Sequence, residues 1–130
     1  MTAAEWEKIK FFKPEEFDSP GSPGSGAMGM DFQFVEKLDR LRISWKRPIS
    51  INSGYRTAEH NLKVGGKTNS AHLRGLAADC KTEDLQDAIK FAVFAASKGF
   101  VRIGVSLKGS YVHIDSDATL PSPATWFYGS

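Results

Sequence analysis

The sequence predicts an α+β fold in which a small, mostly antiparallel sheet has its helices packed on one side. Two segments, residues 30–45 and 85–96, carry apolar residues at helical spacing. Two later segments, residues 100–107 and 110–114, are typical of strands, and a tight turn at Lys108-Gly109 joins them. A hairpin of this kind is antiparallel, so the sheet is expected to be built mainly from such pairs.

The first 29 residues are expected to form a lead-in segment followed by a loop. Residues 4–12 favour a short helix, and Pro14 suits the first turn of another helix. The segment from Ser19 to Gly29 is rich in Gly, Ser and Pro, which indicates a loop. This loop is either a plain surface connection or a lid.

The middle of the chain is predicted to supply the first long helix and the first strand. Residues 49–53 alternate like a strand, so that Arg56 emerges just past its end. Residues 57–63 suggest one or two helical turns before a loop at Gly65-Gly66. The stripe along the helix over residues 30–45 is assigned to the core and consists of Met30, Phe34, Leu38, Leu41 and Trp45.

The second half is predicted to add a buried strand, a second helix and an aromatic tail. Leu76-Ala77-Ala78 is a short buried strand, and Thr82 is a suitable N-cap for the helix that follows. Gly99 is well placed to end that helix, and residues 121–128 are expected to be irregular. The apolar positions of the helix are Leu85, Ile89, Val93 and Ala96.

Length and composition indicate one compact domain over residues 1–130 and restrict its partners. A net charge of +2 is too small to argue for nucleic acid, and no apolar run approaches membrane-spanning length. Residues 1–12 include Glu5 and two lysines, so they are not read as a signal peptide. The single Cys80 excludes an intrachain disulfide and is expected to be a small buried residue.

The most specific pattern is the run from Ser70 to Asp79, which His113 and Asp115 follow near the other end of the chain. Two histidines and a carboxylate can form a zinc site with one open position, as catalytic sites have. In one straight helix the Cα atoms of His72 and Asp79 would lie about 10 Å apart. Donors must approach zinc to roughly 2 Å, so we place His72 on a loop and Asp79 at a strand end.

Gly75 permits the turn that this placement requires. The other interpretation of the run is a surface histidine and an aspartate that caps the next helix. Residues 111–115 alternate, so Tyr111, His113 and Asp115 share one strand face. His113 is then either a ligand or a buried, hydrogen-bonded histidine. The third histidine, His60, is expected at an exposed helix start and outside the site.

These motifs together resemble the zinc D-Ala-D-Ala carboxypeptidase family, and most of all its short, single-domain murein peptidase branch. The likeness extends from about Phe11 to Trp126, with the motifs in the family's order. It rests on Ser53-Gly54-Tyr55-Arg56, Asn61, Gly65-Gly66, the Ser-x-His-x-x-Gly-x-Ala-x-Asp run from Ser70 to Asp79, and Val112-His113-Ile114-Asp115.

The resemblance implies that His72, Asp79 and His113 bind Zn²⁺, and that Arg56 lies at the substrate carbonyl, where a guanidinium stabilises developing negative charge. Substrate-binding positions are expected at Ser70, Tyr55 and Trp126. Ser70 has the alternative role of capping a turn, Arg56 that of a surface ion pair, and Trp126 that of packing the C-terminal segment.

The general base is the point where the chain departs from the family. Several members have a carboxylate three residues before the last zinc histidine, where this chain has Ser110. Asp115 is therefore expected to be the base or a proton shuttle, with Asp117 as the fallback. The alternative for Asp115 is to orient His113, as carboxylates commonly do for zinc-bound imidazole.

The resemblance implies a zinc-dependent peptidase that cuts amide bonds involving D-amino acids in peptidoglycan, in the manner of a phage-type lysis enzyme. We expect a monomer made in the host cytoplasm, which acts on the wall after release or as a virion component. The competing hypothesis is a non-catalytic, zinc-containing wall-binding or virion structural module. The missing carboxylate at Ser110 supports that hypothesis.

Overall fold

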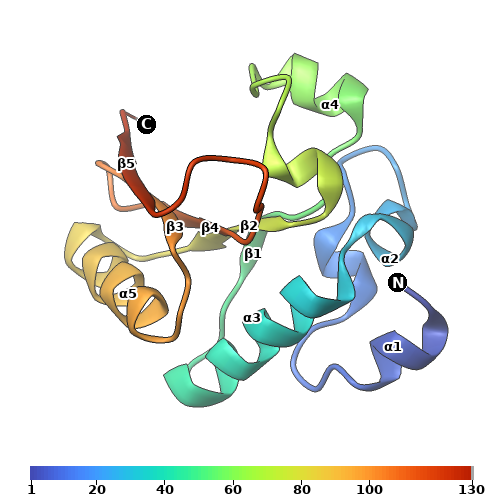
Figure 1. Cartoon of the computed structure of the whole chain (residues 1–130), viewed down its shortest axis with the longest axis horizontal. Coiled ribbons are helices and arrows are strands. Elements are labelled where there is room, and N and C mark those ends of the chain that lie inside the picture. Colours follow the sequence, from blue (N-terminus) through green and yellow to red (C-terminus); the bar gives the residue numbers. More distant parts are fainter. Residues whose placement is uncertain (130) are drawn as a thin grey trace.

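The computed structural model describes residues 1–129, and its fold is the α+β fold that the sequence predicts (Figure 1). Two 3₁₀ turns, η1 and η2, interrupt the loops. In chain order the elements are α1 (Ala3–Glu7), η1 (Pro14–Phe17), α2 (Ser25–Gly29), α3 (Phe32–Trp45), β1 (Ile51–Ser53), α4 (Ala58–Lys63), η2 (Ala71–Arg74), β2 (Ala77–Lys81), α5 (Leu85–Ser97), β3 (Arg102–Ser106), β4 (Tyr111–Asp115) and β5 (Ala124–Tyr128).

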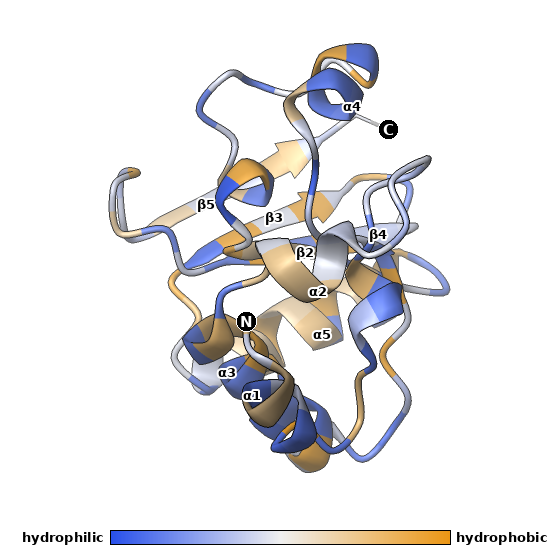
Figure 2. Cartoon of the chain, turned by 90° about the vertical axis from the view of Figure 1, so that its right-hand side faces the viewer, coloured by the Kyte–Doolittle hydropathy of each residue, from blue (hydrophilic) through white to orange (hydrophobic). Residues whose placement is uncertain are grey.

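The sheet has five strands in the order β1-β2-β4-β3-β5, and only the β3–β5 pair is parallel. The pairing sets Asp79 opposite His113 and Gly104 opposite His113 on its other side. Both views place α3 and α5 below the sheet and α4 above it (Figures 1 and 2). No helix among residues 1–129 is long and apolar enough to cross a bilayer.

The hydrophobic core lies between the sheet and the two long helices. Val112 and Ile114 of β4 are fully buried in it, as the alternation of that strand predicts. Cys80 of β2 also points into the core, opposite to Asp79, and burial raises the pKa of its thiol. Helix α3 contributes Phe34 and Leu38, both almost completely buried. One face of the sheet is therefore apolar, and the other is left for polar chemistry.

The long helices differ in how well the sequence located them. Helix α3 begins two residues later than expected, because Asp31 accepts a hydrogen bond from Phe34 N and caps it. For α5 the prediction was wrong in two respects. Asp84, not Thr82, is the N-cap, and Thr82 instead donates to the carbonyl oxygen of Gly109. Moreover, Leu85, Ile89 and Val93 are exposed, while Ala88, Phe91 and Ala95 are buried.

The N-terminal segment is less helical at its start and more helical at its end than predicted. Helix α1 ends at Glu7, because the amides of Lys10 and Phe11 donate to the buried carboxylate of Asp39 on α3. The expected loop after Ser19 contains α2. There Asp18 accepts hydrogen bonds from Gly24 N and Gly26 N, and the backbone of Gly26 packs closely against η1.

The C-terminal segment was expected to be irregular, and that prediction was wrong. Residues 124–128 form β5, which pairs in parallel with β3 over its whole length. A parallel partner so far along the chain leaves no local turn signal, so periodicity alone does not reveal it. The strand brings Trp126 beside Gly104, next to the polar face of β4.

Candidate metal centre

Three acceptor atoms converge on the polar face of the sheet. His72 lies in η2, Asp79 in β2 and His113 in β4, and one ligand atom from each lies within 4.8 Å of the others. All three residues are nearly buried. Asp79 and His113 lie on β2 and β4, two of the three inner strands of the sheet, since β1 pairs outside β2 and β3 outside β4. Asp79 was expected at a strand end, but it stands in the middle of β2.

Backbone contacts place the His72 ring. Ser70 Oγ accepts a hydrogen bond from His72 N and caps η2, and Gly75 ends this turn with a φ of 69°. His72 Nδ1 lies 2.7 Å from the carbonyl oxygen of Gly54. Since a carbonyl only accepts, Nδ1 carries the proton and Nε2 presents a lone pair. Ser70 thus has the capping role that the sequence left open beside substrate binding.

The His113 ring is fixed on its other side by Asp115. His113 Nε2 lies 2.7 Å from Asp115 Oδ2, and His113 Nδ1 lies 2.9 Å from Asp79 Oδ1. Asp115 is ionised: burial opposes its charge, but hydrogen bonds from His113 and from Asp117 N hold its pKa below the usual range. Nε2–H therefore donates to Asp115, and Nδ1 faces Asp79.

This arrangement fits a metal ion. His72 Nε2 is buried and has no hydrogen-bond partner, and it lies 3.3 Å from Asp79 Oδ1. Burial opposes the charge of Asp79, but hydrogen bonding and the two imidazoles hold its pKa well below the usual range. Two ring nitrogens and a carboxylate therefore face one another, and a metal ion between them would be bound by all three. Tetrahedral zinc keeps its ligand atoms roughly 3.3 Å apart, and Asp79 Oδ1 lies 3.3 Å from His72 Nε2 and 2.9 Å from His113 Nδ1.

Arg56 lies at the edge of this group and is held by its neighbours. Nε donates to Ser53 Oγ at 3.1 Å, Nη1 to Asn61 Oδ1 at 3.3 Å, and Nη2 to Asp79 Oδ2 at 3.3 Å. Its side chain is 16% exposed, so it is not the surface ion pair of the alternative interpretation. One N–H on each terminal nitrogen remains for a ligand, since a guanidinium carries five.

The other expected site residues are placed differently. The ring of Tyr55 packs against Gly29 of α2 and the core, so the structure does not bring it into the metal group. Asp117 is buried and pairs with Arg74, and its second oxygen binds Thr119. Ser110 lies just before β4, and its hydroxyl is 3.1 Å from Ser106 Oγ. His60 lies on α4, outside the metal group as expected.

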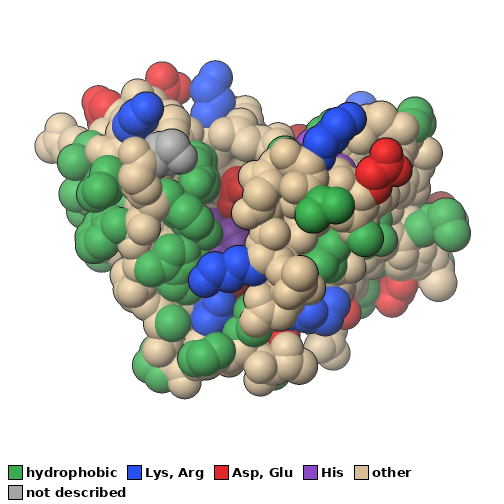
Figure 3. Space-filling model, turned by 90° about the horizontal axis from the view of Figure 1, so that it is seen from above, with side chains coloured by type: hydrophobic (Ala, Val, Ile, Leu, Met, Phe, Trp, Pro, Cys, Tyr) green, Lys and Arg blue, Asp and Glu red, His purple; other side chains and the backbone are tan. Residues whose placement is uncertain are grey.

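An aromatic wall, formed by Tyr111, Trp126 and Tyr128, stands beside His113. The ring centroids of Trp126 and His113 are 5.5 Å apart, and those of Tyr128 and His113 are 6.3 Å apart. Burial raises the pKa of Tyr128 to about 12, so its hydroxyl keeps its proton. The space-filling view shows a groove on this face, with histidine and acidic side chains at its floor and hydrophobic side chains along one side (Figure 3).

Gly104 makes room for this wall. A Cβ there would lie 2.4 Å from Trp126 Nε1 and 2.5 Å from Tyr128 Cε2. We predict that Gly104→Ala displaces the Trp126 indole and costs about 1–3 kcal/mol of stability. In a ¹H–¹⁵N spectrum the indole signal of Trp126 should move and those of Trp6 and Trp45 should not. Thr125→Ala, on the opposite face of β5, is the control, and equal shifts in both variants would contradict the prediction.

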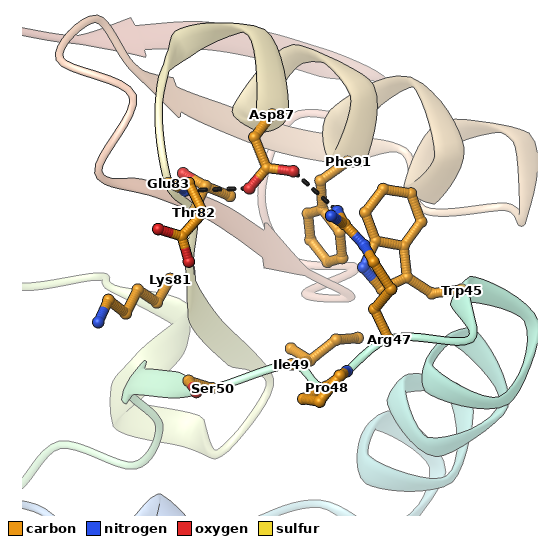
Figure 4. Close-up of a pocket in the computed structure, with 10 residues that line it drawn as sticks. All are labelled: Trp45, Arg47, Pro48, Ile49, Ser50, Lys81, Thr82, Glu83, Asp87 and Phe91. Carbon is orange, nitrogen blue, oxygen red and sulfur yellow. Dashed lines mark hydrogen bonds and ion pairs between the residues drawn. The ribbon is translucent and has the colours of Figure 1, made fainter.

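A separate cavity of about 270 Å³ lies between the β2–α5 connection and the segment that joins α3 to β1 (Figure 4). Trp45, Lys81 and Phe91 are among its lining residues. Its principal charged groups neutralise each other, since Arg47 Nη2 lies 2.7 Å from Asp87 Oδ1. None of the metal-group residues lines it, so the chemistry belongs to the groove.

Sequence reasoning missed Arg102, the Gly54 carbonyl and Tyr128. The hairpin register could have revealed Arg102, because a tight turn at Lys108-Gly109 sets Arg102 directly opposite Asp115. The contact between Gly54 and His72 has no counterpart in the sequence pattern. It depends on Gly54 backing closely onto Phe17, where a Cβ would lie 2.8 Å away.

Comparison with known proteins agrees with this geometry. The profile of the Peptidase M15 family matches residues 11–115. A zinc D-Ala-D-Ala carboxypeptidase from Streptomyces albus G is 37% identical over 68 residues. The match covers 52% of this chain but only 26% of that relative, so the chain corresponds to about a quarter of its length. Because the family profile covers most of the chain and includes all three metal-group residues, the chain belongs to the Peptidase M15 family.

Proposed function

We propose that the chain is a zinc-dependent peptidase that hydrolyses amide bonds involving D-amino acids in peptidoglycan stem peptides or cross-bridges. The observation that carries the proposal is the convergence of His72 Nε2, His113 Nδ1 and Asp79 on one point of a groove. The similarity to a zinc D-Ala-D-Ala carboxypeptidase supports the substrate class. We further propose phage-type wall lysis as the setting, on the resemblance to short murein peptidases.

In this proposal His72, Asp79 and His113 hold the zinc ion. Zinc supplies Lewis-acid chemistry, which makes water a nucleophile at neutral pH and polarises a carbonyl. Arg56 directs its remaining N–H groups to the carbonyl oxygen, where negative charge develops during hydrolysis. Its three existing hydrogen bonds preorganise the guanidinium, so little freedom is lost when substrate binds.

The contacts of Asp115 support its orienting role over that of a base. Oδ1 accepts from Arg102 Nε at 2.8 Å and from Asp117 N at 3.1 Å, and Oδ2 accepts from His113. Only 1% of its surface is exposed. A carboxylate so engaged and so buried has no access to a water in the groove. We therefore assign Asp115 to fixing the ring of His113 and not to proton transfer.

The aromatic wall supplies the substrate-facing side of the groove. Trp126 is half-buried against His113, and this contact supports a cleft-lining role over that of packing the C-terminal segment. Tyr128 retains its proton and can donate a hydrogen bond to a backbone group of the peptide. We propose that the wall contacts residues flanking the scissile bond, with Ser70 and Tyr55 acting structurally.

The test is to incubate zinc-loaded protein with purified peptidoglycan and to measure the masses of the released fragments. We expect cleavage that stops when a chelator removes zinc and returns when zinc is restored. Release of single D-alanine would identify a carboxypeptidase, and release of longer peptides an endopeptidase. Zinc that binds stoichiometrically without any fragment would contradict the proposal and leave the non-catalytic wall-binding module.

A further inference from the structure

Arg102 of β3 connects three parts of the site. Its backbone pairs with Asp115 across the β3–β4 hairpin, and its side chain is 12% exposed. Nε donates to Asp115 Oδ1 at 2.8 Å, and Nη1 donates to the carbonyl oxygen of Pro121. The guanidinium carbon also lies 4.9 Å from the ring centroid of Trp126. A single planar group thus contacts the hairpin, the segment before β5 and the aromatic wall.

The first consequence concerns the carboxylate of Asp115. This carboxylate is almost completely buried, and its two oxygens are bound separately, Oδ1 by Arg102 Nε and Oδ2 by His113 Nε2. A buried carboxylate needs a paired, hydrogen-bonding cation. Arg102 supplies that charge and, through Nε, fixes which oxygen is turned away from the ring of His113. The other oxygen, Oδ2, is thereby left to accept the proton of His113 Nε2 at 2.7 Å. The carboxylate plane is set by the arginine and not by the histidine alone.

The second consequence concerns the ligand atom. Because Nε2 is engaged with Asp115, Nδ1 is the nitrogen that remains for a metal ion, on the side of Asp79 and His72. Groups that orient a ligating histidine typically change metal affinity by about 10–100-fold when they are removed. Arg102 acts on His113 through Asp115, and Asp115 depends on Arg102 for both its charge balance and its orientation.

The third consequence concerns the aromatic wall. The guanidinium lies against the Trp126 ring, an arrangement that is favourable for arginine and an indole. Trp126 in turn lies against His113. The position of the wall is therefore coupled to the same side chain that orients the metal ligand.

We propose that Arg102 is a positioning residue, which orients the metal ligand His113 through Asp115 and sets the aromatic wall through Trp126. The inference rests on the zinc centre of the proposed function. It predicts that loss of Arg102 changes both zinc affinity and the geometry at the metal, without touching the metal itself.

The chain offers a matched control. Arg47 also pairs with an aspartate and lies over an indole: Nη2 is 2.7 Å from Asp87 Oδ1, and the guanidinium carbon is 4.4 Å from the ring centroid of Trp45. Neither Asp87 nor Trp45 belongs to the metal group. Removing Arg47 therefore breaks the same two kinds of contact without touching the residues that orient His113.

The experiment compares Arg102→Met, Arg102→Lys and Arg47→Met in the full chain. Zinc affinity is measured by competition with a chromophoric chelator, metal geometry by the visible spectrum of the Co²⁺-loaded protein, and folding by thermal unfolding without metal. We expect Arg102→Met to weaken zinc binding about 10–100-fold and to alter the cobalt spectrum. Arg102→Lys keeps the charge but not the planar contacts, so it should recover only part of the affinity.

Arg47→Met should keep zinc affinity within about twofold of the parent, with an unchanged cobalt spectrum. Parental zinc affinity and spectrum in Arg102→Met would overturn the inference, as would an equal loss of affinity in Arg47→Met. If Arg102→Met does not fold, the inference is tested on Arg102→Lys, with the same measurements of zinc affinity and of the cobalt spectrum. A wild-type chain that binds no zinc, or a His72→Ala chain that binds it equally well, would overturn the proposed function instead.

Discussion

His72→Ala is expected to abolish zinc binding and peptide hydrolysis together. His72 is one of three ligands, and its Nε2 has no other partner in the described part of the chain. Two remaining ligands do not make the three-ligand set that catalytic zinc sites use. Because metal-ion catalysis is worth several kcal/mol of barrier, the rate of hydrolysis should fall by at least about 10³-fold.

The measurement combines zinc content per chain, thermal unfolding with and without zinc, and fragment release from peptidoglycan. Zinc that binds only the folded chain stabilises it, by about 2.7 kcal/mol at a hundredfold excess over its dissociation constant. The wild type should therefore unfold at a higher temperature when zinc is present. His72→Ala should show no such rise.

Truncation of a buried ring also leaves a cavity and an unpaired Gly54 carbonyl, so a second variant is needed. Asp79→Asn preserves the shape of the side chain while it replaces the anionic ligand with an amide. His60→Ala removes a histidine outside the metal group and serves as the control. Zinc-dependent stabilisation that persists in Asp79→Asn would place the metal elsewhere.

The sequence predicted those parts of the fold that local chemistry determines. Helix α3 has one apolar face, and Asp31 stands just before its first residue. The position of the helix and the burial of that face therefore follow from spacing and capping. The hairpin follows from a turn flanked by two alternating segments. In the site, the convergence of His72, Asp79 and His113 was expected from the motif, and the structure brings these three together.

The parts that could not be predicted depend on distant partners. The apolar residues of α5 cover more than half of its circumference, so periodicity does not say which part of that wide apolar face meets the sheet. Strand β5 exists through its pairing with β3, and α2 through contacts with Asp18 and η1. The role of Asp115 depends on both of its oxygens being bound, which no spacing along the chain reveals.

Arg56→Lys is expected to lower kcat for hydrolysis by about 10²–10³-fold while zinc still binds. Lysine keeps the positive charge but has one ammonium group on a flexible stem. It cannot bond Ser53, Asn61 and Asp79 at once, as the guanidinium does through its three nitrogens. The charge would therefore no longer be held where the carbonyl oxygen becomes negative, and the loss should appear mainly in kcat.

The measurement is steady-state hydrolysis alongside zinc content, with Arg40→Lys as the control, since Arg40 forms only an exposed pair with Glu36 on α3. Arg56→Ala adds a second readout, because it leaves space for a small cation at the position of the guanidinium. Added guanidinium ion should restore part of the activity of Arg56→Ala but none of that of His72→Ala. Near-parental kcat in Arg56→Lys would show that a positive charge alone is sufficient. The fixed geometry of the Arg56 guanidinium would then not contribute to catalysis.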